Sequence, residues 1–200
     1  LRYFSKKNPP DESPSLAVAL RIDQSASMSA FGRLEAAKEA AIAVCEFCDA
    51  CGVPVLIYGD TADRSPREKM SMYAYLDWEE PALNDKYSIM SMQGISNNRD
   101  GMALRVLSEK LAKATQTTKL LISLSDGQPK AMPDYSGSSA ADDMKQTIKE
   151  YTRKGIVFLA AAIGQDKDSI CEIYGQERFI DITDLKQLPA RLVQTIARYL

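Results

Sequence analysis

The sequence of 200 residues contains no histidine. Histidine is the commonest general base near neutral pH and the commonest transition-metal ligand in proteins. Its absence excludes histidine-dependent hydrolases and histidine-ligated zinc sites. The chain also has no Gly-x-x-x-x-Gly-Lys-Ser/Thr motif, so it carries no P-loop for ATP. Any ATP hydrolysis connected with this protein must come from a partner.

Long apolar runs and runs of basic residues are missing as well. No stretch reaches the ~18–20 apolar residues that span a bilayer. Residues 1–15 lack the apolar centre and the cleavage site of a signal peptide. The 25 basic and 27 acidic residues are spread along the chain, without the basic patch that nucleic-acid binding requires. We therefore expect a cytoplasmic domain with no membrane insertion and no nucleic-acid partner.

Cysteine is scarce, with four residues, and three of them form a Cys-x-x-Cys-x-x-Cys run at Cys45, Cys48 and Cys51. Runs of this kind supply ligands in iron–sulfur proteins. However, apolar residues recur at a spacing of three and four over residues 33–50, which indicates a helix that ends before Gly52. We favour buried thiols on that helix, with a cluster or a disulfide as the alternatives.

The composition, 45% hydrophobic and 26% charged, is typical of one globular domain that buries roughly 70% of its unfolded surface. We expect this domain to cover residues 15–200. The first residues are polar and the chain begins with Leu1. We therefore expect residues 1–14 to be a linker or the tail of a longer upstream region.

Apolar runs alternate with amphipathic stretches along the whole chain. Strands are predicted at residues 15–22, 53–58, 70–76, 119–125, 155–163 and 178–182. Helices are predicted at residues 33–50, 101–114, 138–154 and 184–200, with Asp184 as the cap of the last and with a short helix near 81–90. Parallel strands need crossover helices, so this order predicts a doubly wound α/β fold. The sheet should be mostly parallel, with 70–76 as one antiparallel edge strand.

A polar cluster follows the first predicted strand. In doubly wound folds, ligands bind beyond the carboxyl ends of the strands. Asp23, Ser25 and Ser27 can direct three hard oxygens from a single loop toward one point. Oxygen ligands of this kind suit Mg²⁺, with Mn²⁺ or Ca²⁺ as alternatives. Taken alone, the cluster is more typical of a turn and a helix cap.

Two further polar clusters favour an ion site over that structural interpretation. Residues 97–101, with Asn98 and Asp100, begin a predicted helix, and residues 123–129 end a predicted strand at Asp126. Each cluster alone would be explained as a helix cap or a turn. Three such clusters at one end of an α/β sheet predict a common site.

The order Asp-x-Ser-x-Ser, Asn-x-Asp-Gly-x-Ala-Leu and Ser-Asp-Gly-x-Pro resembles the metal-ion-dependent adhesion site of von Willebrand factor A domains, over residues 15–200. Most of that family has threonine in the middle motif, where this chain has Asn98 followed by Asp100. This departure resembles a bacterial branch, the C-terminal domains of nitric oxide reductase activation proteins and of a cobaltochelatase subunit. Residues 155–158, 173–175 and 184–189 are similar to that branch as well.

The resemblance implies a role for each residue of the site. Ser25 and Ser27 would contact the ion directly, and Asp23 and Asp126 directly or through water. Asn98 would take the place of the threonine, since an amide oxygen can donate a lone pair to a hard cation.

Two more residues have supporting roles in this resemblance. Asp100 would be a further ligand, a residue that contacts the ligands and not the ion, or a helix cap. Gly127 would let the backbone approach the site closely.

The resemblance also implies a function. The domain would bind a partner protein and would not be an enzyme. An acidic side chain of a partner would complete the coordination of the ion. The expected partner is an AAA+ ATPase or a client metalloenzyme, in metal insertion or metalloenzyme activation. The alternatives are a subunit of a cobalt or magnesium chelatase, a structural domain with an empty site, and a metal-dependent phosphatase or hydrolase. The hydrolase would use Asp23 or Asp126, with Asp100, Asp134 or Lys130 as its base.

Overall fold

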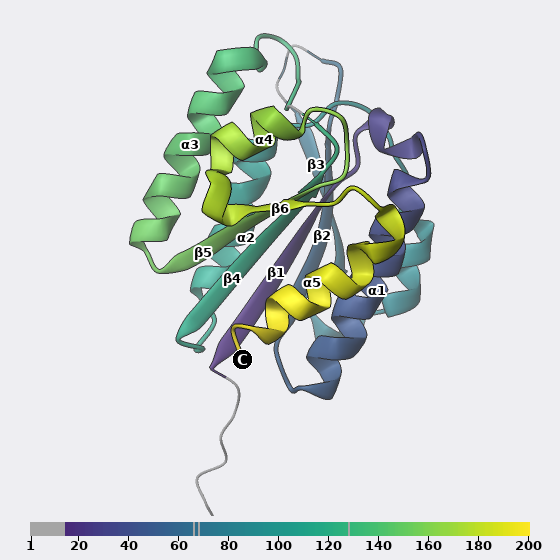
Figure 1. The fold of residues 1–200 in the computed structure, drawn as a ribbon, viewed down its shortest axis with the longest axis vertical. Coiled ribbons are helices and arrows are strands. Elements are labelled where there is room, and N and C mark those ends of the chain that lie inside the picture. Colours follow the sequence, from purple (N-terminus) through teal and green to yellow (C-terminus); the bar gives the residue numbers. More distant parts are fainter. Residues whose placement is uncertain (1–14, 66, 68, 128) are drawn as a thin grey trace, which may run out of the picture.

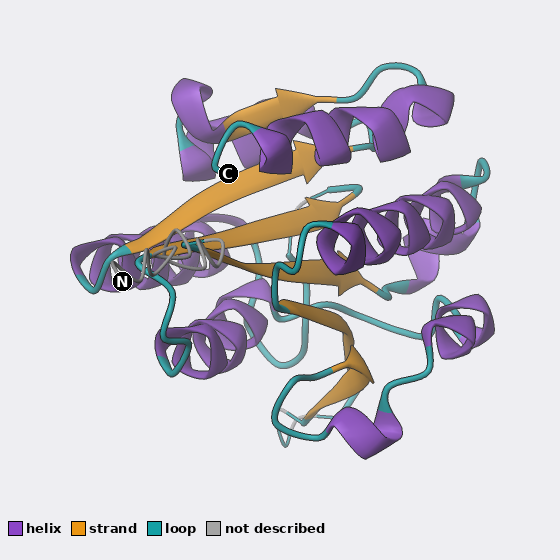
Figure 2. Cartoon of the chain, turned by 90° about the horizontal axis from the view of Figure 1, so that it is seen from below, coloured by secondary structure: helices purple, strands orange, loops and turns teal. Residues whose placement is uncertain are grey.

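The computed structural model describes residues 15–200, apart from residues 66, 68 and 128. A six-stranded sheet has the order β3-β2-β1-β4-β5-β6 and lies between two layers of helices (Figures 1 and 2). The strands are β1 (Leu16–Asp23), β2 (Val55–Ala62), β3 (Met70–Leu76), β4 (Thr118–Ser125), β5 (Ile156–Ala162) and β6 (Phe179–Asp181). The expected linker at residues 1–14 lies outside the described residues.

The strand directions confirm the predicted fold class. β3 pairs with β2 in the antiparallel sense, and all other neighbouring strands are parallel. The α-helices are α1 (Arg33–Ala50), α2 (Asp100–Ala112), α3 (Gly137–Arg153), α4 (Lys167–Tyr174) and α5 (Leu188–Ala197). This is a doubly wound α/β sheet with one antiparallel edge strand.

The central strand β1 is buried on both faces, and it divides the core into two parts. Leu16 and Leu20 pack with residues of α1 and α5, whereas Ala17 and Ala19 pack with residues of α2, α3 and α4. Side chains of a strand alternate between its two faces. An apolar residue at nearly every position of β1 therefore requires helices on both sides of the sheet.

Some local predictions differ from the structure. Helix α4 was not predicted, because its eight residues are too few to show a helical periodicity. Asp184 caps a 3₁₀ turn, Leu185–Gln187, that precedes α5, and not α5 itself. The region expected to form one short helix holds two 3₁₀ helices, Pro81–Leu83 and Lys86–Ser91. Within the described part of the chain, none of the helices combines the length and hydrophobicity needed to cross a bilayer.

The prediction that Cys45 and Cys48 lie on the buried face of a helix is confirmed. Both are buried in α1, and all four cysteines are unpaired. Burial raises the pKa of Cys48 to about 12, so this thiol stays protonated at neutral pH. Gly52 adopts a φ of 65°, the left-handed conformation with which glycine ends many helices.

Candidate metal centre

The first and third polar clusters meet at the carboxyl ends of β1 and β4. The Ser25 and Ser27 hydroxyl oxygens are 3.0 Å apart, and the Ser27 hydroxyl donates to Asp126 Oδ1 at 3.0 Å. The Ser25 backbone N–H donates to Asp23 Oδ1 at 2.7 Å. Asp23, Ser25, Ser27 and Asp126 thus form one hydrogen-bonded group, called here the carboxyl-edge cluster.

Strand register explains why these residues meet. β1 and β4 are parallel neighbours with Ile22 opposite Leu124, so the residues that follow leave the sheet side by side. The Ser125 hydroxyl donates to Asp23 Oδ2 at 3.0 Å. After Asp23 the chain turns through a 3₁₀ helix, Ala26–Ser29, whose Met28 is buried while Ser27 is exposed. The buried methionine anchors the loop and leaves the serine at the surface.

The middle polar cluster joins this site through Asn98. Its amide nitrogen donates to Asp23 Oδ2 at 3.2 Å and to Asp100 Oδ1 at 3.0 Å, while its amide oxygen accepts from the Lys130 backbone N–H at 3.0 Å. The reverse amide orientation would set oxygen against two carboxylates. In this orientation the amide oxygen expected as a ligand points away from Asp23. We therefore treat Asn98 as a residue that positions Asp23.

Asp100 is the first residue of α2 and does not cap it, since Arg99 stands at the cap position. Its Oδ1 accepts from Arg21 Nη2 at 2.8 Å. The carboxylate is therefore held by an arginine beneath the carboxyl-edge cluster.

The close backbone approach that was predicted at Gly127 is more severe at another glycine. A Cβ atom on Gly164 would lie 1.5 Å from the backbone oxygen of Asp126. A Cβ atom on Gly127 would lie 3.2 Å from a carboxylate oxygen of Asp166, a contact that a small shift could relieve. Gly164, which follows β5, is thus the glycine that the backbone at Asp126 requires.

Below the carboxyl-edge cluster lies a group of buried charges that the sequence analysis did not identify. Arg21 donates from Nε and Nη2 to the two oxygens of Asp60, at 2.5 and 2.7 Å, and from Nη2 also to Asp100. These three residues, called here the buried arginine cluster, are at most 1% exposed. A signal was present, because an arginine inside an apolar strand needs carboxylate partners from elsewhere in the chain.

The carboxylates of the two clusters differ in their electrostatic surroundings. Burial raises the pKa of Asp23 to about 6, and nearby Arg21 opposes that rise. Burial also raises the pKa of Asp60 and of Asp100, against the attraction of Arg21. Asp126 has a guanidinium partner of its own, since Arg33 Nη1 donates to its Oδ2 at 2.6 Å.

The donor set of the carboxyl-edge cluster fits a hard cation. Within residues 15–200 as described, no group of three or more His, Cys, Asp or Glu side chains is placed to hold a metal ion. The cluster instead offers two carboxylates, Asp23 and Asp126, and two serine hydroxyls. Oxygen ligands in this proportion suit an ion such as Mg²⁺, which keeps part of its coordination for water or an external group.

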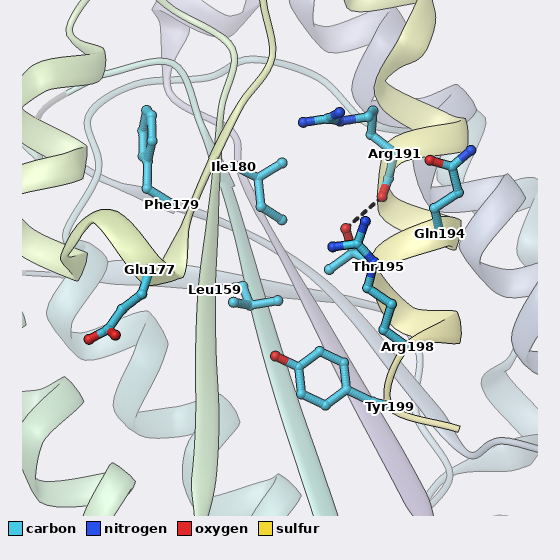
Figure 3. A pocket seen from close by; sticks show the side chains of 9 residues that line it. All are labelled: Leu159, Glu177, Phe179, Ile180, Arg191, Gln194, Thr195, Arg198 and Tyr199. Carbon is cyan, nitrogen blue, oxygen red and sulfur yellow. Dashed lines mark hydrogen bonds between the residues drawn. The ribbon is translucent and has the colours of Figure 1, made fainter.

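A cavity of about 270 Å³ lies between α5 and the strands β5 and β6 (Figure 3). Its charged lining residues Glu177, Arg191 and Arg198 are all exposed to solvent. The cavity shares no residue with the carboxyl-edge cluster. The convergence of oxygens from three buried side chains and the exposed Ser27 makes that cluster the stronger candidate site.

No protein-family model matches the chain. The uncharacterized protein YojO of Bacillus subtilis (strain 168) is 27% identical in an alignment 219 residues long, which covers 100% of this chain and 34% of that protein. Protein NorD of Brucella melitensis is 27% identical over 185 residues, 88% of this chain and 29% of NorD. The chain thus spans about a third or less of the length of these relatives.

Solved structures with the same fold include von Willebrand factor domains. The vWF domain of the pili tip protein Mfa5 from Porphyromonas gingivalis superposes with a TM-score of 0.67, at 13% identity, over 92% of this chain and 95% of that one. The manganese-loaded TRAP protein of Plasmodium vivax superposes with a TM-score of 0.63, at 12% identity, over 92% and 74%. At these identities the likeness establishes the fold and no more.

Proposed function

We propose that this von Willebrand factor A-like domain, which resembles NorD, is a protein-interaction domain that depends on one divalent cation. The ion would be Mg²⁺, with Mn²⁺ or Ca²⁺ as alternatives, held by Asp23, Ser25, Ser27 and Asp126. The observation that carries the proposal is the convergence of these four side chains at one edge of the sheet.

The protein's own residues set the shape of this site. Asp23 receives hydrogen bonds from the Ser25 N–H, the Ser125 hydroxyl and the Asn98 amide, which fix both of its carboxylate oxygens. The hydroxyls of Ser25 and Ser27 face each other at 3.0 Å. A bound ion would supply one strong, directional positive charge for an acidic side chain of a partner protein.

We extend the proposal to the partner from the relatives. We propose a role beside an AAA+ ATPase in the activation of a metalloenzyme, in the cytoplasm, as the resemblance to nitric oxide reductase activation proteins implies. A subunit of a cobalt or magnesium chelatase is the alternative. We propose no catalysis by this domain. Asp100, the buried candidate for a general base, is already held by Arg21 and Asn98.

Titration calorimetry with Mg²⁺ and with Mn²⁺ tests the ion site. The wild type should bind one ion per chain, and Asp23→Ala should abolish binding, because Asp23 lies at the centre of the hydrogen-bonded group. Asp134→Ala is the matched control, an exposed aspartate of the loop after β4 with no part in the cluster. Equal binding by all three proteins, or no binding by the wild type, would refute the proposed site.

Affinity capture tests the interaction. The purified ATPase or client enzyme that is proposed as the partner should be retained with Mg²⁺ and lost with EDTA, while circular dichroism shows that the domain stays folded without the ion. Equal recovery in both conditions would show that the domain binds its partner through another surface.

A further inference from the structure

We infer that Arg33 is an internal counter-charge of the candidate metal centre. By pairing with Asp126 it weakens the binding of the ion, and it leaves the ion more positive charge with which to attract an acidic ligand. This inference rests on the proposed function, since it concerns the same ion site.

The geometry divides the two oxygens of Asp126 between two partners. Oδ1 accepts from the Ser27 hydroxyl at 3.0 Å, on the side of the proposed ion, and Oδ2 accepts from Arg33 Nη1 at 2.6 Å. The side chains of Arg33 and Asp126 are only 12% and 5% exposed. Water therefore screens this pair weakly, and the guanidinium offsets much of the charge that Asp126 can offer to an ion.

The position of Arg33 in the chain is unfavourable for the helix that contains it. Arg33 is the first residue of α1, and the partial positive charge at a helix N-terminus repels a cation. The first turn of a helix normally favours acidic residues. Pairing with Asp126 offsets this repulsion, so the arginine is explained by the site and not by the helix.

Phe31 adds a second unfavourable feature at the same place. Its φ of 57° lies in the left-handed region, which costs free energy for a bulky residue, and the residue is 80% exposed. The ring centroid is 5.1 Å from Arg33 Cζ, a cation–π distance. The ring thus shields one side of Arg33 from water and strengthens the pair of Arg33 with Asp126.

Asp23 supplies the contrast within the site. The donors to its carboxylate, Ser25, Ser125 and Asn98, are all neutral. Arg21 acts on Asp23 through space, without a hydrogen bond among the described contacts, so Asp23 would give a bound ion more of its negative charge than Asp126 would. A site in which both carboxylates were uncompensated would hold the ion more tightly and repel an acidic ligand more strongly.

The test compares Arg33→Gln with the wild type, with Mn²⁺ as the probe ion. Calorimetry should show roughly tenfold tighter binding of Mn²⁺ to Arg33→Gln, because repulsion between the guanidinium and the ion is lost. Damage to the fold would weaken binding, so a gain in affinity cannot arise from misfolding.

Arg33→Lys keeps the charge and should bind Mn²⁺ with an affinity within about twofold of the wild type. Lys130→Gln, which removes an exposed charge from the same sheet edge, should also change little.

A second readout concerns the acidic ligand, with acetate as the probe. Water-proton relaxation reports how acetate displaces water from protein-bound Mn²⁺. Arg33→Gln should require several-fold more acetate than the wild type, and Phe31→Ala should fall between the two in both measurements. Opposite shifts in the affinity for Mn²⁺ and for acetate are the expected signature.

The outcomes separate the two proposals. If the wild type binds Mn²⁺ but Arg33→Gln binds it equally or more weakly, Arg33 is not a counter-charge and only this inference fails. The same holds if Lys130→Gln tightens binding as much as Arg33→Gln does. If neither the wild type nor any variant binds Mn²⁺, the proposed ion site fails and the inference fails with it.

Discussion

The carboxyl-edge cluster and the buried arginine cluster lie against each other, joined by Asn98. They differ in the partners of their carboxylates and in their access to solvent. In the buried cluster, Arg21 and its two carboxylates are at most 1% exposed and satisfy one another. In the carboxyl-edge cluster, Asp23 is also 0% exposed, but only neutral groups among the described residues donate hydrogen bonds to it, and Ser27 lies at the surface. The first arrangement supports the fold, and the second is the candidate metal centre. Pairing with Arg21, and not burial alone, distinguishes the carboxylates of the first from those of the second.

The largest expected effect comes from breaking the buried arginine cluster. Arg21→Met leaves Asp60 and Asp100 buried without a counter-ion, which should lower the free energy of unfolding by about 3–5 kcal/mol. Urea unfolding followed by circular dichroism measures this change. Arg105→Met is the matched control, because it breaks the half-exposed pair of Arg105 with Asp143 and should cost no more than about 1 kcal/mol. Similar losses in the two variants would show that burial of an ion pair does not determine how much the pair contributes to stability.

A cavity in the apolar core should destabilise the fold without touching either cluster. Leu121 is fully buried in β4 and packs toward α2 and α3. Leu121→Ala should lower the free energy of unfolding by roughly 2–5 kcal/mol and leave the affinity for Mg²⁺ unchanged. Urea unfolding and calorimetry on the same sample check both parts. A loss of ion affinity at temperatures where the variant is fully folded would mean that the core and the site are coupled.

A paired carboxylate outside both clusters provides a pH test. Burial acts to raise the pKa of Asp77, but hydrogen bonds from Lys110 and Tyr58, at 2.7 and 2.5 Å, outweigh it and lower the pKa. A carboxylate with a lowered pKa in the folded state stabilises the protein above the ordinary pKa of aspartate, near 3.9. This stability is lost as the pH falls through the lower, folded-state pKa.

Asp77→Asn should therefore destabilise the protein by about 1–2 kcal/mol at pH 7. The difference between variant and wild type should shrink as the pH falls below about 4, where the unfolded chain takes up a proton first, and it should vanish only below the lower pKa of folded Asp77. Urea unfolding at pH 7, 5 and 3.5 measures it. A difference that stays constant over this range would show that the charge of Asp77 contributes nothing.

The smallest effect on stability is expected at the carboxyl-edge cluster itself. Ser27→Ala removes an exposed hydroxyl and should change the free energy of unfolding by no more than about 0.5 kcal/mol. It should nevertheless weaken Mg²⁺ binding at least ~10-fold, because a direct oxygen ligand is lost. Thermal melts in EDTA and calorimetry check the two parts. A large loss of stability would show that Ser27 supports the fold, as the residues of the buried arginine cluster do.

The sequence by itself determined the fold class and most of the elements. The apolar run that became β1 predicted a strand covered on both faces, and the spacing over residues 33–50 predicted α1 with the bounds observed. These features follow from local periodicity, which residues close in sequence specify. The loop Asp23, Ser25 and Ser27 was identified for the same reason, since one short segment carries all three oxygens.

Tertiary structure alone decided how the charges at the site are paired. Arg21 meets Asp60 and Asp100 across separations of 39 and 79 residues, and Arg33 meets Asp126 across 93. Only strand order and register bring such residues together. The same packing turned the Asn98 amide nitrogen toward Asp23 and set Gly164 against the backbone of Asp126. Periodicity says which face a residue occupies, but the partner on that face is fixed by contacts between segments that lie far apart in the sequence.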